Sequence, residues 1–156
     1  VERMKAARNF NVANGCIGQV KYGMLDMAWY TLTEDFDGDV EKFEKAVWAK
    51  LQVLPAVQGT CMSVMFSHIM DGGYSAGYYG YKWAEVLDAD AFSVFKERGL
   101  FSREVGEEFR RKLLEKGGTV HPMTLYKDFR GQEPTIEALL RRNGIVPEKK
   151  IKERID

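Results

Sequence analysis

Residues 68–83 read HIMDGGYSAGYYGYKW, and this stretch decides how the chain is expected to fold. It holds four of the fifteen glycines and four of the seven tyrosines in the sequence. A glycine inside a helix costs about 1 kcal/mol relative to alanine, so glycines mark places where the backbone bends or approaches another group closely. We therefore expect a break at Gly72-Gly73, followed by a long helix from about Ser75 to Arg98.

The tyrosines of this expected helix divide between two faces. At about 100° per residue, Tyr74, Tyr78 and Tyr81 share one face, which we expect to be hydrated because acidic residues continue it. Tyr79 and Trp83 share the other face, which we expect to lie in the core. Phenol groups on a hydrated face suit hydrogen bonding to a ligand, including the oxyanion formed in acyl transfer. The alternative, that the tyrosines pack in a core with their hydroxyls bonded to carbonyl groups, stays open on the residues alone.

His68 precedes Tyr74 by six residues, across the glycine break, and could join the tyrosines as a hydrogen-bond donor. A lone histidine is more often a structural residue, so the residues alone do not choose between these roles for His68. Gly77 and Gly80 are three residues apart and would leave one strip of the expected helix without side chains. Residues 68–81 are therefore a candidate ligand site, with plain packing as the competing interpretation.

Helical spacing dominates the remainder of the chain, and no segment alternates with the period of two that a half-buried strand shows. The sequence therefore predicts an all-α, multi-helix bundle. Asp39 and Ser102 are expected to cap helix N-termini, and Gly99 and Gly144 to end helices. Besides the long helix, we expect helices over about 17–32, 40–54, 60–70, 103–116, 119–129 and 135–143.

Composition narrows the possible functions. The chain has 156 residues, enough for one domain with its own core. Lys and Arg total 23, equal to Asp and Glu, so no global basic field exists to attract nucleic acid or anionic lipid. From Arg141 onward six basic side chains accompany three acidic ones, which we interpret as a solvated tail rather than a nucleic-acid arm. Charges interrupt every apolar run, so no membrane-spanning helix is expected.

The sequence holds no recognisable metal site. Cys16 and Cys61 lie 45 residues apart without a CxxC spacing, and we expect both to be core thiols. The acidic turn around Asp37 resembles an EF-hand loop, but Val40 and Ala46 occupy the positions that need glycine and glutamate. We therefore expect no calcium site.

Three stretches, in this order, resemble the thimet oligopeptidase and peptidyl-dipeptidase family of zinc metallopeptidases, most of all its bacterial peptidyl-dipeptidase branch. They are RNFN at 8–11 followed by GMLDMAW at 23–29, then residues 68–83, then LYKDFRGQEP at 125–134 followed by ALLRRNGI at 138–145. The resemblance implies that residues 1–146 form the C-terminal helical portion of a zincin-like catalytic domain. It leaves residues 147–156 as a charged C-terminal extension.

The resemblance also implies roles for individual residues. The family's two tyrosines seven apart match Tyr74 and Tyr81, and the tyrosine at Tyr81 donates to the oxyanion of the tetrahedral intermediate. The glycine-rich loop closes on peptide, although Asp71 stands where relatives often carry a small residue. The substrate-binding residues that we expect in addition to the catalytic Tyr81 are His68, Tyr74, Tyr78, Gly72, Gly73 and Gly77.

The family's zinc is bound by a His-Glu-x-x-His helix, which this sequence lacks. The only histidines are His68 and His121, and in the family the whole zinc site lies N-terminal to the matched region. We therefore expect a fragment of a longer zinc peptidase, with zinc in the parent enzyme, none in this chain and no hydrolysis by the chain alone.

The expected partners are short peptides and the missing N-terminal part of the same polypeptide. An apolar surface that normally packs on that part could also make the fragment dimerise. The compartment stays open between cytoplasm and periplasm. A different class of function, a non-catalytic helical interaction module that kept the fold, is the alternative.

Overall fold

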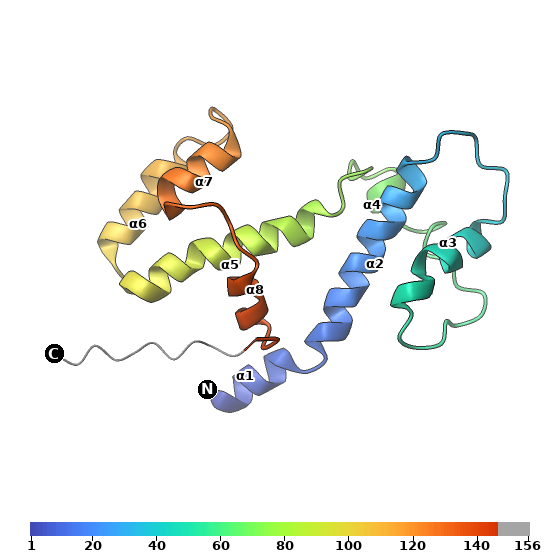
Figure 1. The fold of residues 1–156 in the computed structure, drawn as a ribbon, viewed down its shortest axis with the longest axis horizontal. Coiled ribbons are helices and arrows are strands. Elements are labelled where there is room, and N and C mark those ends of the chain that lie inside the picture. Colours follow the sequence, from blue (N-terminus) through green and yellow to red (C-terminus); the bar gives the residue numbers. More distant parts are fainter. Residues whose placement is uncertain (147–156) are drawn as a thin grey trace. The chain divides into compact units, whose positions relative to one another are not determined.

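The computed structural model describes residues 1–146, and within them every regular element is a helix and none is a strand (Figure 1). The predicted all-α fold is therefore confirmed, while the expected extension 147–156 lies outside the described residues. A 3₁₀ turn follows α3 and a π-helical turn follows α6. The elements are α1 (Glu2–Asn9), α2 (Val12–Tyr30), α3 (Val40–Trp48), the 3₁₀ turn (Ala49–Leu51), α4 (Ser67–Met70), α5 (Gly80–Arg98), α6 (Arg103–Phe109), the π-helical turn (Arg110–Leu114), α7 (Pro122–Arg130) and α8 (Glu137–Arg142).

The chain forms two compact units, Val1–Trp83 and the residues from Ala84 onward, with the boundary inside the first turns of α5. Each unit has its own apolar core. In the first unit, Phe66, Ile69 and Tyr78 are buried, and partly buried Tyr22, Trp29 and Met62 pack around them. In the second unit, one cluster joins Val94, Val105 and Phe129, and another joins Val86, Ala89 and Leu139.

The predicted helix caps are confirmed. The Asp39 carboxylate accepts from the Lys42 amide at 3.0 Å, and this hydrogen bond lowers the pKa of Asp39. The Ser102 hydroxyl accepts from the Val105 amide at the start of α6. Gly99 and Gly144 both have left-handed backbone angles, with φ of 115° and 70°, as expected where helices end.

The helix expected over residues 60–70 is mostly wrong, because only Ser67–Met70 is helical. The buried carboxylate of Glu44, on α3, accepts hydrogen bonds from the amides of Met62 and Ser63 at 2.9 and 2.7 Å. It also accepts from the Ser63 hydroxyl at 2.7 Å. These bonds tie the segment before α4 to α3, and the segment follows an irregular path.

The helix expected from Ser75 begins only at Gly80. Asp26 of α2 accepts the amides of Ala76 and Tyr78 at 2.8 and 2.9 Å, and Ala76 adopts a left-handed φ of 54°. A left-handed residue interrupts a right-handed helix. The helix therefore starts four residues after Ala76, and residues 74–79 form a loop.

The expected division of the tyrosines between two helical faces is also wrong. Tyr78, placed on the hydrated face, is only 8% exposed, whereas Tyr79, placed in the core, is 61% exposed and Trp83 is 45% exposed. The reason is the same loop, since the angular steps of a helix do not apply to residues 74–79.

Candidate functional site

Tyr74, Tyr81 and His68 come together in the first unit, although a loop rather than a helix brings them there. The rings of Tyr74 and Tyr81 stack with centroids 5.0 Å apart and planes inclined by 28°. The His68 ring lies 5.9 Å from that of Tyr74. Tyr74 and Tyr81 are each 40% exposed, so one edge of this aromatic group is open. The structure thus joins three of the residues that the sequence selected.

Tyr78 lies behind this group and contacts two of its members. Its ring centroid is 5.1 Å from that of Tyr81 and 6.2 Å from that of His68. Its hydroxyl is 3.1 Å from the Gln19 side-chain oxygen and donates to it. Tyr78 is therefore the buried support of the group, while the phenols of Tyr74 and Tyr81 are its accessible donors.

The backbone after α4 folds back on the helix and returns Tyr74 to His68. The amides of Asp71 and Gly72 both donate to the Ser67 carbonyl, and the Tyr74 amide donates to the His68 carbonyl at 3.0 Å. At Gly72 a Cβ atom would lie 2.9 Å from the His68 Cα atom, so only glycine fits without displacing backbone. This tight reversal explains why the histidine and the first tyrosine are neighbours despite their separation in sequence.

The other two candidate glycines differ from Gly72. Gly73 has a left-handed φ of 79°, which favours glycine over any other residue. At Gly77 a Cβ atom would make only ordinary contact, 3.5 Å from the Tyr74 carbonyl oxygen. The fold of this unit therefore requires glycine at Gly72 and Gly73 but not at Gly77.

The Tyr81 phenol is a neutral donor at physiological pH. A hydrogen bond with Tyr74 raises the pKa of Tyr81 above its ordinary value of 10.0, and burial raises the pKa of Tyr78. A neutral phenol can donate to an oxygen that gains negative charge during acyl transfer. The arrangement thus offers a half-exposed phenol, a second phenol stacked on it and an imidazole beside them.

Two side chains of α2 that the sequence analysis did not select, the buried Asp26 and the partly buried Gln19, fix this arrangement. Asp26 holds the loop through the amides of Ala76 and Tyr78, and Gln19 binds the Tyr78 hydroxyl. The available signal for Asp26 was a lone acid inside the apolar run GMLDMAW, since a charge in such a run is buried only when it is bonded. Nothing local distinguishes Gln19 from a surface glutamine.

His121, the second histidine, caps a helix in the other unit. Its Nδ1 atom accepts from the Met123 amide at 3.3 Å, at the start of α7. Among residues 1–146, no group of three or more His, Cys, Asp and Glu side chains is placed to hold a metal ion. The side chains in this range therefore do not fit a zinc site by themselves.

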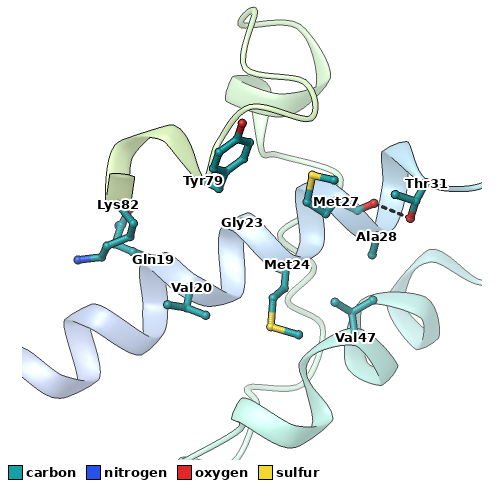
Figure 2. Close-up of a pocket in the computed structure, with 10 residues that line it drawn as sticks. All are labelled: Gln19, Val20, Gly23, Met24, Met27, Ala28, Thr31, Val47, Tyr79 and Lys82. Carbon is teal, nitrogen blue, oxygen red and sulfur yellow. Dashed lines mark hydrogen bonds between the residues drawn. The ribbon is translucent and has the colours of Figure 1, made fainter. Parts of the chain in front are cut away.

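An open groove of about 540 Å³ lies beside α2 (Figure 2). Figure 2 shows Tyr79 and Lys82 on one side of α2 and Val47 of α3 on the other. A Cβ atom at Gly23 would lie 3.8 Å from the Tyr79 backbone, so α2 passes close to the loop here. The groove is lined by Gln19, Val20, Gly23, Met24, Met27, Ala28, Thr31, Val47, Tyr79 and Lys82.

The self-association expected of the isolated chain stays a prediction.

No helix in the part of the chain that the structure describes combines the length and the apolar character needed to cross a membrane.

Comparisons with known proteins agree on one family. The model of peptidase family M3 matches residues 1–145. The chain is 38% identical to the oligopeptidase A of Escherichia coli and 41% identical to that of Haemophilus influenzae, over 93% and 90% of its own length. It is 38% identical to the dipeptidyl carboxypeptidase of Salmonella typhimurium over 92% of its length.

Two facts qualify these similarities. The chain spans about a fifth of the length of these relatives, 22%, 21% and 22% respectively. The identities to oligopeptidase A and to dipeptidyl carboxypeptidase are also similar, so they do not favour the peptidyl-dipeptidase branch over the other. Since the family model nevertheless covers nearly every residue, the chain belongs to peptidase family M3.

Proposed function

We propose that this chain supplies the oxyanion- and substrate-binding donors of a zinc-dependent oligopeptidase or peptidyl-dipeptidase that hydrolyses short peptides. The observation that carries the proposal is the stacked pair of Tyr74 and Tyr81 beside His68, open to solvent along one edge. Family membership supports a peptidase as the parent protein. The proposal assigns this chain one wall of the peptide-binding site and leaves the metal to other residues.

In this proposal Tyr81 is the catalytic residue. Its hydroxyl is hydrogen-bonded to Tyr74 in the absence of peptide, and a substrate oxygen would take the place of Tyr74. As the scissile carbonyl becomes tetrahedral, its oxygen gains charge and binds the phenol more tightly than the substrate carbonyl does. Selective stabilisation of the tetrahedral state accelerates hydrolysis, whereas equal binding of both states would not.

The other candidate residues bind and enclose the peptide. Tyr74 and His68 would donate to peptide carbonyl oxygens. Tyr78, bonded to Gln19, would support the rings of His68 and Tyr81. Gly72, Gly73 and Gly77 would leave the backbone of the loop bare where the peptide main chain approaches it.

In this proposal, zinc is bound by residues outside this chain. When bound, it would polarise the scissile carbonyl and activate a water molecule. The sequence has no His-Glu-x-x-His motif, and the Nδ1 atom of His121 accepts from the Met123 amide as a cap of α7. We therefore propose that the isolated chain does not hydrolyse peptides.

The proposal can be tested by substituting this chain for the segment of Escherichia coli oligopeptidase A that it matches. In that chimera, Tyr81→Phe removes only the hydroxyl. We expect kcat for a fluorogenic peptide to fall about 10²- to 10³-fold, the usual loss for one oxyanion donor, with a smaller change in KM.

Tyr79→Phe is the matched control, because Tyr79 is a neighbouring phenol that is 61% exposed on the groove side of α2. It should leave kcat unchanged. Normal turnover in the Tyr81→Phe chimera would remove Tyr81 from the mechanism. A chimera that folds and binds zinc but never turns over would instead favour the non-catalytic interaction module.

A further inference from the structure

The side chain of Asp26 is fully buried, and the loop carrying the tyrosines is built on it. Its exposed fraction is 0%, and each carboxylate oxygen accepts one main-chain amide, Oδ1 from Ala76 and Oδ2 from Tyr78. Hydrogen bonds to an ionised acceptor are stronger than neutral ones, especially away from water. Asp26 therefore fixes two alternate residues of the loop from a helix about fifty positions earlier in the sequence.

Asp26 binds the loop in a conformation that is unfavourable for alanine at position 76. Ala76 has a φ of 54°, a region that residues with a Cβ atom rarely occupy. Such a conformation persists only where surrounding contacts determine it. The hydrogen bond from the Ala76 amide to Asp26 is the contact made at that residue.

The same face of α2 holds Tyr78 at both ends. Gln19, Tyr22 and Asp26 lie three and four residues apart, so they project from one side of the helix. Asp26 binds the Tyr78 amide, Gln19 binds its hydroxyl, and the Tyr22 ring meets its ring edge-on at 5.9 Å. Tyr78 is thereby fixed in position along its whole length.

The fixed Tyr78 ring is in turn the surface against which the exposed donors lie. Its centroid is 5.1 Å from the Tyr81 ring and 6.2 Å from the His68 ring. A displacement of Tyr78 would move the ring that carries the Tyr81 hydroxyl. Displacements near 1 Å at a reacting group are enough to reduce turnover about 10²-fold.

We propose that Asp26 is a positioning residue for peptide hydrolysis, which sets the place of the Tyr81 hydroxyl through the loop backbone and Tyr78 without touching the substrate itself. This inference rests on the proposed function. It adds a residue on α2, outside the glycine-rich loop, to the machinery of the site. It also predicts that losing one acceptor oxygen at Asp26 harms turnover more than substrate binding.

The test replaces Asp26 by asparagine in the same chimera. Asparagine keeps one acceptor oxygen and puts an amide group, which cannot accept, opposite the second main-chain N–H. We expect kcat to fall about 10- to 10²-fold with KM nearly unchanged. In the 156-residue chain carrying Asp26→Asn, hydrogen exchange should be faster at the amides of Ala76 and Tyr78 than at amides within α2.

Glu44→Gln is the matched control. Glu44 is also a buried carboxylate that binds main-chain amides, but it holds Met62 and Ser63, before α4. The two substitutions should cost similar stability, and only Asp26→Asn should lower kcat strongly. An equal loss of kcat in both variants, or none in Asp26→Asn, would make Asp26 a purely structural residue and overturn the proposal.

A second variant keeps the test decisive if Asp26→Asn alone does not fold. Adding Ala76→Gly relieves the left-handed strain, so the double variant should recover stability while kcat stays below that of Ala76→Gly alone. Full recovery of kcat with stability would contradict positioning. The Tyr81→Phe chimera separates the two proposals. Normal turnover there rejects the proposed function, whereas impaired turnover there with normal turnover in Asp26→Asn rejects only the role of Asp26.

Discussion

Asp26 in the first unit and Asp90 in the second are both buried aspartates on long helices, yet they are stabilised in different ways. Asp26 accepts two main-chain amides of a loop. Asp90 lies 3.2 Å from the Arg130 guanidinium and accepts from the Tyr126 hydroxyl at 2.5 Å, both on α7. A buried carboxylate needs such partners because it has lost its hydration.

The difference lies in what each carboxylate determines. Main-chain amides belong to particular residues of the loop, so Asp26 specifies a backbone conformation. A guanidinium and a phenol are the ends of side chains, so Asp90 specifies how α5 and α7 pack. The first arrangement shapes a site, and the second holds two helices together.

The largest stability effect is expected at Asp90. Asp90→Ala leaves the Arg130 guanidinium, which is 16% exposed, without its buried partner, and we expect a loss of about 3–5 kcal/mol in the free energy of unfolding. Asp88→Ala is the control on the same helix, since Asp88 pairs with Arg142 at the surface and should contribute under about 1 kcal/mol. Urea unfolding followed by circular dichroism measures both. Equal losses would show that burial does not distinguish the two pairs.

A smaller effect is expected at the phenol partner. Tyr126→Phe removes one donor to Asp90, and we expect a loss of about 1–3 kcal/mol near neutral pH. Burial, followed by the hydrogen bond to Asp90, raises the pKa of Tyr126 well above its ordinary value of 10.0. An acid with a raised pKa in the fold stabilises it fully below the unfolded-state pKa, and this contribution is lost as the pH rises above about 10.

The pH dependence provides the check on this residue. The difference in unfolding free energy between the unmodified chain and Tyr126→Phe should be constant from pH 7 to 9 and shrink above about pH 10. Urea unfolding at each pH supplies the values. A difference that grows with pH would contradict a protonated, hydrogen-bonded Tyr126.

The smallest expected effects lie in the loop that Asp26 holds. Gly72→Ala places a methyl group 2.9 Å from the His68 Cα atom, and we expect a loss of about 1–2 kcal/mol together with impaired turnover in the chimera. Gly77→Ala makes only ordinary contacts and should change stability by less than about 0.5 kcal/mol. Thermal unfolding compares them. Matching losses would mean that the reversal after α4 is not tight.

The sequence predicted the features whose causes are local. Asp39 and Ser102 cap helices because each side chain bonds an amide three residues later, and Gly99 ends a helix through its own backbone freedom. His68, Tyr74 and Tyr81 were selected from a family motif, and the structure brings them together.

The two failed helix boundaries share a non-local feature. In the segments that precede α4 and α5, main-chain amides bind a carboxylate that is far away in sequence, Glu44 in the first case and Asp26 in the second. No local pattern reveals which distant carboxylate will bind a given amide. For the same reason, the sequence could not show that Tyr78 is buried while Tyr79 is exposed.

The left-handed Ala76 has a consequence for anyone who improves this protein by selection. Glycine there would relieve the strain and would be favoured in a screen for heat resistance. The same replacement would widen the range of shapes open to the loop, and catalysts often need a single one. A screen that measured heat resistance but not turnover would therefore select a change that lowers turnover. An Ala76→Gly replacement is therefore the marker by which stable but slow variants can be recognised.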